Sequence, residues 1–255
     1  MYPYVLLLVF TTLSYCIASP LSPDLPDGQI VLNPDPSFNS HRSGPLQALE
    51  VDSPRPDKAP YYDPRELGGS LLNRNPWGGG EPLNVIISAQ SSPDVLRKNG
   101  LIAFARSLGL WNECADLHIG DPQEANLGDG KGWESELLVM RESWWPIVGS
   151  CLESAIGGNH FRAYKQNGTE ANSGAWFLAA SKEVDLRGKH KIARNGYNIG
   201  RDLIVQKAIG GTRYLGRSWE TRVEYIEGLL KPGSEGINHG IAQDGKVALL
   251  TVKEY

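Results

Sequence analysis

The sequence predicts an α+β fold, in which a mainly antiparallel sheet packs against two or three helices. Three observations support this class. Apolar runs of strand length recur through residues 83–255. Turn-forming pairs such as Pro232-Gly233 and Asp244-Gly245 lie between or beside these runs. A few longer stretches carry helical spacing and helix end signals. Hairpins mixed with a small number of helices are typical of a single α+β domain.

Six segments have the length and apolar content of strands. They are residues 83–88, 136–140, 160–166, 175–184, 217–230 and 246–255. The segments 160–166 and 175–184 flank a polar stretch, which predicts a hairpin. In the segment 217–230, Trp219, Val223 and Tyr225 fall on alternate positions, as expected for a strand with two different faces.

Three segments have the end signals of helices. Ser92-Pro93-Asp94 predicts a helix start, because it joins a hydroxyl cap, a proline at the first helical position and an early carboxylate. We expect that helix to end at Gly109. A second helix is expected over residues 143–156. A third is expected over residues 195–209, with Asn198 as its candidate cap. The predicted buried face of the third helix consists of Ile199, Leu203 and Ile209.

The chain divides into three parts. Residues 1–18 carry no charged side chain and contain an apolar run followed by small residues, which is typical of a secretory signal peptide cut after Ala18. The alternative is a membrane anchor, but the run is shorter than the ~20 apolar residues that span a bilayer. Residues 19–80 hold eleven of the seventeen prolines, which predicts a flexible leader or linker, with removal as a pro-segment as the alternative. Residues 83–255 are expected to form the folded domain.

Secretion gives the cysteines and one asparagine a meaning. Cys16 leaves with the signal peptide, so Cys114 and Cys151 remain as an even pair in an oxidising compartment. This favours a disulfide between them, with two separate buried thiols as the alternative. Asn167-Gly168-Thr169 is an N-glycosylation acceptor in the predicted hairpin loop. The sequence thus predicts a secreted, extracellular glycoprotein with no later apolar segment long enough to hold it in a membrane.

Composition and motifs argue against several classes of function. The net charge of -4 argues against a nucleic-acid partner. There is no glycine-rich phosphate loop and no nucleophile elbow, and we expect no cofactor. The histidines of the domain lack the short-spaced pair that structural zinc sites use, so no metal is expected either. These histidines are His118, His160, His190 and His239. A hydrogen-bonded structural role is the alternative reading for each.

The densest polar segment is residues 183–202. It brings the carboxylates of Glu183 and Asp202 into one stretch with His190 and Arg201. A histidine beside a carboxylate is suited to general acid–base chemistry. An arginine at a helix start can bind an anion. The alternative is a solvated loop that leads into a capped helix.

Four short motifs follow one another in the second half of the domain. They are His160-Phe161-Arg162, Gly174-Ala175-Trp176-Phe177, His190-Lys191-Ile192 and Gly200-Arg201-Asp202-Leu203. In this order they resemble the LssY C-terminal domain family, which often has a second histidine where Lys191 stands. The resemblance implies an α+β fold and no particular reaction, because the activity of that family is not established. It implies five candidate catalytic residues: His160, Arg162, His190, Arg201 and Asp202.

Two main hypotheses of function follow. The first is a secreted binding or interaction module for an extracellular ligand or protein, because no catalytic signature is present. Trp133, Trp144 and Trp145 could then form an aromatic platform for a sugar, with core packing as the alternative. The second is a secreted hydrolase acting on an anionic ester, which requires His160, His190 and Asp202 to converge. A secreted effector that contacts a host protein is a third reading.

Overall fold

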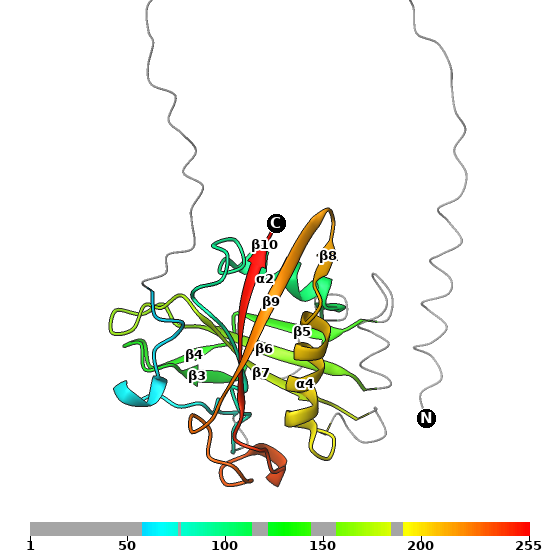
Figure 1. Ribbon diagram of the computed structural model, residues 1–255. Coiled ribbons are helices and arrows are strands. Elements are labelled where there is room, and N and C mark those ends of the chain that lie inside the picture. Colours follow the sequence, from blue (N-terminus) through cyan, green and yellow to red (C-terminus); the bar gives the residue numbers. More distant parts are fainter. Residues whose placement is uncertain (1–57, 76–77, 114–121, 144–156, 185–190) are drawn as a thin grey trace, which may run out of the picture. The chain divides into compact units, whose positions relative to one another are not determined.

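The dominant element of the fold is a strongly curled sheet of eight strands (Figure 1). The computed structural model describes residues 58–75, 78–113, 122–143, 157–184 and 191–255. Across the sheet, the strands follow the order β2-β5-β6-β7-β1-β10-β9-β8. Neighbouring strands are antiparallel except for β1 and β10, which are parallel. The strands are β1 (Val85–Ile87), β2 (Leu110–Asn112), β5 (Leu138–Glu142), β6 (Asn159–Lys165), β7 (Trp176–Lys182), β8 (Thr212–Tyr214), β9 (Arg217–Ile226) and β10 (Val247–Glu254).

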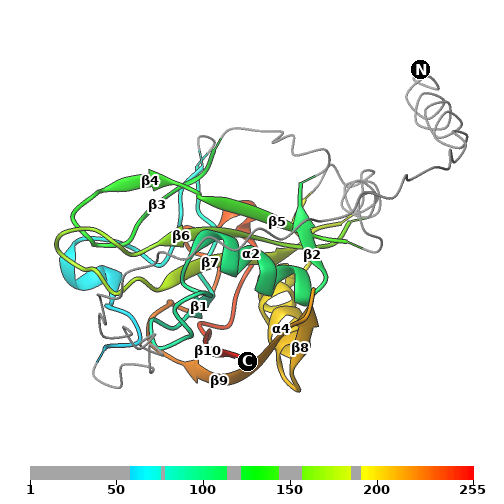
Figure 2. The ribbon, with the colours of Figure 1, turned by 90° about the horizontal axis from the view of Figure 1, so that it is seen from above.

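The two α-helices of the described residues lie inside the curl of the sheet. They are α2 (Lys98–Ser107) and α4 (Gly196–Ala208). Figure 2 shows them between β5–β7 on one side and β8–β10 on the other. Phe104 of α2 and Ile204 of α4 pack in one core with Phe161 of β6 and Trp219 of β9. Burying this apolar surface from both halves of the sheet stabilises the curl.

The convex face of the sheet is covered by extended chain. Tyr164 of β6 and Phe177 of β7 form a second core there with Leu71. The ring of Tyr61 meets the Phe177 ring edge-on at 6.3 Å between centroids. The Tyr62 backbone N–H donates to the side-chain oxygen of Gln166. Residues 58–75, which the sequence places in the leader, therefore pack on the domain.

These features agree with the predicted α+β class in its broad form. The described residues lie in one compact unit that is mostly sheet and has two helices. The sheet is mixed, because the central strands β1 and β10 run parallel. A separate two-stranded sheet is formed by β3 (Glu124–Asn126) and β4 (Trp133–Ser135). Two 3-10 helices, η2 (Pro64–Leu67) and η5 (Asn238–Gly240), complete the described elements.

All six predicted strands are present, and their ends shift by no more than four residues. β6 and β7 form the predicted hairpin, in which His160 is opposite Ser181 and Tyr164 is opposite Phe177. The sequence misses β2, β3, β4 and β8, each of which has three residues. So short a strand has no detectable period of its own. β1 also has three residues, but it is predicted because it lies in the longer apolar run 83–88.

The predicted helix start at Ser92 is wrong. The helix begins at Lys98 after Arg97, and no side chain caps it. The Ser92 hydroxyl instead accepts a hydrogen bond from the backbone N–H of Glu254 at the end of β10. Residues 93–96 form turns, and Gly100 lies directly against the carbonyl oxygen of Asp94. The hydroxyl therefore stabilises a strand end, a choice that depends on a residue 162 positions away.

The predicted cap and buried face of the third helix are also wrong. Asn195 precedes the helix, in a left-handed conformation and without a side-chain cap bond. Asn198 lies in the first turn, where its side-chain oxygen accepts from the Asp244 backbone N–H. Ile199 and Ile209 are exposed. The buried face consists of Tyr197, Gly200, Arg201, Ile204, Val205 and Ala208. This face is selected because Gly200 permits close contact with β7.

We expect Gly200→Ala to destabilise the domain. An added Cβ would lie 2.5–2.6 Å from the backbone N, Cα and C of Ser181, and backbone atoms cannot yield as a flexible side chain does. Alanine gains about 1 kcal/mol over glycine in a free helix. Overpacking costs about 1–3 kcal/mol, so a net loss is expected. Urea unfolding of Gly200→Ala and of the exposed control Gln206→Ala measures this. A stabilised Gly200→Ala would contradict the close contact.

Several predicted features lie outside the described residues. They are the signal peptide at 1–18, residues 144–156 of the second helix, Trp144, Trp145, Cys114, Cys151, His118 and His190. The glycosylation acceptor Asn167 is described, and it is exposed in the loop between β6 and β7. Neither helix of the described part combines the length and the apolar character that a membrane span requires.

Candidate functional site

The candidate site lies on the convex face of the sheet and is organised by β6. His160, Arg162 and Tyr164 alternate with Phe161 and Ala163 along this strand. Because side chains of a strand alternate between faces, and Phe161 and Ala163 enter the core that contains the helices, the three polar residues face the other way. Two of the five predicted catalytic residues, His160 and Arg162, therefore share one face of the sheet.

A row of polar side chains runs across three strands at His160. Arg141 of β5 and Ser181 of β7 are its direct neighbours in the register. The Ser181 hydroxyl lies 3.4 Å from His160 Nε2. Glu183 Oε1 lies 3.5 Å from His160 Nδ1, and its other oxygen accepts from Arg141 Nη1 at 3.1 Å. His160 and Glu183 thus bring a histidine beside a carboxylate, whereas the pairing predicted within residues 183–202 involves His190. His190, the other candidate partner, lies outside the described residues.

Arg141 joins this row to the edge of the sheet. Its Nε donates to Glu113 Oε1 at 3.3 Å, just after β2. The side chains of Arg141, Glu113 and Glu183 are all largely buried. A guanidinium between two carboxylates is a geometry that arginine suits, because its donors lie in one rigid plane. Arg141 therefore fixes the orientation of the Glu113 and Glu183 carboxylates.

A second charged group surrounds Arg162, two residues further along β6. Arg162 Nη1 lies 3.4 Å from Glu136 Oε1, and Arg162 Nε lies 3.6 Å from Glu81 Oε2. The backbone N–H of Glu81 donates to Asn73 Oδ1 at 2.6 Å. Asn73 Nδ2 donates in turn to Gln123 Oε1 at 2.6 Å. This network holds both glutamates against the sheet, although they come from segments that are distant in sequence.

The two groups contain more carboxylates than guanidiniums. Glu81, Glu113, Glu136 and Glu183 share Arg141 and Arg162. Burial raises the pKa of the Glu81 carboxyl and outweighs the lowering by the Arg162 charge. The charges of Glu183 and Glu136 raise this pKa further, and the hydrogen bond with Gln123 lowers it. Glu81 therefore keeps its proton to a higher pH than a glutamic acid with the ordinary pKa of 4.5 does. A buried carboxylic acid of this kind can donate a hydrogen bond or a proton.

This raised pKa predicts a pH dependence of stability. The folded protein binds the Glu81 proton more tightly than the unfolded chain, whose ordinary pKa is 4.5. As the pH rises from 4.5 through the folded pKa, the folded state must lose a proton that it favours, and the free energy of unfolding falls. Glu81→Gln removes this loss. We expect its stability, relative to the wild type, to increase by about 1 kcal/mol or more between pH 4 and pH 7.

Urea unfolding at each pH measures that difference. The matched control is Glu220→Gln, because Glu220 is exposed on β9. A relative stability of Glu81→Gln that is flat or falling with pH would mean that Glu81 is ionised in the folded state throughout this range.

Arg201 and Asp202 lie elsewhere. Both belong to α4, which occupies the concave face with Phe161 and opposite His160. Arg201 is buried and donates to both oxygens of Asp244, at 2.6 and 2.9 Å, and to the Lys246 carbonyl. Its Nε donates to Asp202, whose side chain is half exposed. The structure thus brings His160 and Arg162 together but does not join Arg201 and Asp202 to them. The Arg201 contacts tie α4 to the turn before β10.

A pocket of about 430 Å³ opens beside the charged groups, at the edge of β5. Its polar walls include Glu113 and Glu136, which are the outer partners of Arg141 and Arg162. The remaining lining residues are Lys98, Asn112, Pro122, Ser135, Leu137, Leu138 and Val139. The two carboxylates therefore connect the buried charged groups to space that a small molecule can fill.

Sequence reasoning misses most of this site. Glu81, Glu113, Glu136 and Arg141 belong to no motif, and each comes from a different segment. Among the described residues, no cluster of histidine, cysteine and carboxylate side chains could hold a metal ion. Trp133 is exposed on β4, but the Arg74 guanidinium covers its ring at 4.4 Å. The partner tryptophans of the predicted platform lie outside the described residues.

Comparisons with protein-family models, curated proteins and solved structures find no match to this chain. The resemblance to the LssY C-terminal domain family therefore stays a prediction from its motifs.

Proposed function

We propose that the protein is a secreted binding module whose ligand is a small polar molecule held in the pocket beside β5. One observation carries this proposal. Glu113 and Glu136 line the pocket and are fixed in place by Arg141 and Arg162. Oriented carboxylates accept hydrogen bonds from hydroxyl groups, and Asn112, Ser135 and Lys98 add donors on the same walls. A ligand rich in hydroxyl groups, such as a saccharide, suits this lining and this volume.

Binding to a glycan array, followed by calorimetry with each glycan that binds, tests the proposal. Ser135 is an exposed lining residue, so Ser135→Trp should fill the pocket with little effect on folding and should abolish binding. Glu136→Gln should weaken binding by roughly tenfold through the loss of a charged acceptor. Ser234→Trp, on an exposed turn away from the lining, is the matched control. No binding above that of the denatured protein, or equal binding by Ser135→Trp, would refute the proposal.

Secretion is the other part of this proposal. It is supported by the apolar run in residues 1–18 and by the exposure of Asn167 at a loop tip. The Asp129 carboxylate holds that loop, because it accepts from the backbone N–H groups of Asn167 and Gly168. We expect eukaryotic cells to release a protein that begins at Ser19 and carries a glycan. Amino-terminal sequencing and loss of the glycan mass in Asn167→Gln test both features.

A hydrolase is the second candidate, and a specific arrangement favours it. Ser181, His160 and Glu183 follow one another at 3.4 and 3.5 Å, in the order of a hydroxyl, a base and an orienting carboxylate. This order suits attack on an ester. However, Ser181 and His160 have no exposed surface, so a substrate could reach the hydroxyl only after its surroundings open. For this reason the geometry supports binding better than catalysis.

Labelling separates the two functions. A fluorophosphonate probe reacts with an activated serine, and a hydrolase would carry the label on Ser181 and lose it in Ser181→Ala. Hydrolysis of p-nitrophenyl acetate and p-nitrophenyl phosphate, compared between these proteins, then shows whether a neutral or an anionic ester is cleaved. Absence of both label and hydrolysis would exclude the serine hydrolase and leave the binding module.

A further inference from the structure

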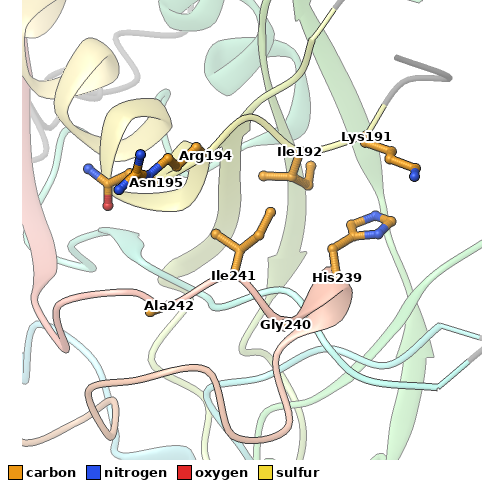
Figure 3. A pocket seen from close by; sticks show the side chains of 8 residues that line it. All are labelled: Lys191, Ile192, Arg194, Asn195, His239, Gly240, Ile241 and Ala242. Carbon is orange, nitrogen blue, oxygen red and sulfur yellow. The ribbon is translucent and has the colours of Figure 1, made fainter.

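A second pocket lies between two segments that lead into α4 and β10. Its volume is about 840 Å³. One wall consists of Lys191, Ile192, Arg194 and Asn195, which precede α4, and the other is the stretch 239–242, which includes η5. Figure 3 shows the eight side chains that line it. No lining residue is shared with the pocket beside β5.

The charged side chains of this lining are all basic. Lys191 and Arg194 are cationic, and His239 is the third basic group, while no carboxylate is among the lining residues. Within the described part of the chain, neither Lys191 nor Arg194 forms an ion pair, in contrast to the paired arginines of the convex face. All three basic side chains are exposed. The pocket therefore offers an uncompensated positive potential to a solute.

The walls of the pocket are held by backbone contacts. Val184 N–H donates to the Lys191 carbonyl, and Ala193 N–H donates to the Lys182 carbonyl, which fixes the first wall against β7. Asn238 N–H donates to the Gly80 carbonyl and fixes the second wall. Ile192 is itself buried in a small core with Tyr197 and Ile237. A pocket whose walls are already ordered loses less entropy when it binds a ligand.

Polar and apolar groups are separated along the pocket. In Figure 3, the side chains of Lys191 and His239 lie together at one end, whereas Arg194 and Asn195 lie at the other. Ile192 and Ile241 face one another between these ends. A ligand that fits has a negatively charged group at one end and an apolar body that covers the two isoleucines.

We propose that this pocket is a second binding site, which takes an organic anion with an apolar body. The anionic group lies against Lys191 and His239, and the apolar body covers Ile192 and Ile241, which belong to one small packed core. Carboxylates, sulfonates and phosphate monoesters share the required chemistry. The apolar contact selects these molecules over inorganic anions, because burial of the body adds a hydrophobic contribution that phosphate or sulfate lacks.

The dye 8-anilinonaphthalene-1-sulfonate is a direct probe, because it is a sulfonate on an aromatic body and becomes fluorescent on binding. N-phenyl-1-naphthylamine has the same body without the charge and reports the apolar contribution alone. We expect saturable binding of the sulfonate by the full chain, weakened by roughly tenfold in Lys191→Met through the loss of a charged donor. Lys246→Met, which removes an exposed lysine outside the pocket, should bind as the wild type does. Binding of the neutral dye should be the same in all three proteins.

Two further variants locate the site. Ala242 is exposed and lines the pocket, so Ala242→Trp should fill it and remove binding of both dyes. Ser135→Trp, which blocks the pocket beside β5, should leave dye binding unchanged, and failure of one site is thus distinguished from failure of the other. Thermal unfolding confirms that each variant is folded. No saturable sulfonate binding, or equal affinity in the wild type, Lys191→Met and Ala242→Trp, would overturn the proposal.

Discussion

Arg162→Met is expected to lower the free energy of unfolding by about 3–5 kcal/mol, the cost of removing one partner from a buried ion pair. The guanidinium lies between Glu136 and Glu81, at 3.4 and 3.6 Å, and all three side chains are largely buried. Methionine fills a similar volume but leaves the Glu136 carboxylate without the Arg162 cation, and it removes the charge that lowers the pKa of Glu81. The expected loss of stability is electrostatic, because the change in packing is small.

A set of variants isolates that cause. Arg213→Met, on the exposed side of β8, is the matched control and should change stability by less than about 0.5 kcal/mol. Combining Arg162→Met with Glu81→Gln and Glu136→Gln should recover most of the loss, because neither acid around position 162 can then carry a charge. Urea unfolding of the four proteins measures this. A loss below about 1 kcal/mol for Arg162→Met would mean that its ion pairs stabilise the fold no more than solvent-exposed pairs do.

Arg201→Met is expected to lower the free energy of unfolding by about 2–4 kcal/mol, slightly less than for a fully buried pair because Asp244 keeps about a third of its side chain exposed. Arg201 is buried and makes two bonds to Asp244 and one to the Lys246 carbonyl. Its loss would release α4 from the turn before β10. Arg222→Met is the control, because Arg222 is mostly exposed and, within the described ranges, pairs with Glu224 alone.

Acid should reduce this effect. Burial raises the pKa of Asp244, but the hydrogen bonds from Arg201 and the Lys246 backbone outweigh it, so the pKa lies below the ordinary value of 3.8. The pair stabilises the fold fully above pH 3.8, and the contribution disappears as the pH falls through the folded pKa. The difference between wild type and Arg201→Met should therefore narrow below pH 3.8. A constant difference would mean that Arg201 acts through packing.

The two variants also separate the roles of Arg162 and Arg201, two of the five candidate residues. If Arg201 only ties α4 to the turn before β10, Arg201→Met should bind a ligand of the β5 pocket with unchanged affinity once it is folded. Arg162→Met should weaken that binding by up to the roughly tenfold loss expected for Glu136→Gln, because Arg162 orients Glu136. The motif Gly200-Arg201-Asp202 would then have a structural role and not a catalytic one. Gly200 permits the close contact between α4 and Ser181, and Arg201 binds Asp244 in the turn before β10.

The sequence by itself determines the local parts of this protein. Apolar runs predict β1, β5, β6, β7, β9 and β10, and the polar stretch around Asn167 predicts the hairpin between β6 and β7. Alternation along β6 also places His160 and Arg162 on one face before any contact is known. These features depend on residues that are close in sequence, so a linear pattern contains them.

Only the tertiary structure decides the partners of those residues. Ser92 was expected to cap a helix, but its hydroxyl accepts a hydrogen bond from the backbone N–H of Glu254, which is distant in sequence, at the end of β10. Glu81, Glu113 and Glu136 meet the arginines of β5 and β6 because the curl of the sheet and the chain that covers it bring separate segments together. The folding of distant segments also brings Arg201 within hydrogen-bond distance of Asp244. A buried charge must find a partner wherever the chain supplies one, and that choice is made in space and leaves no period in the sequence.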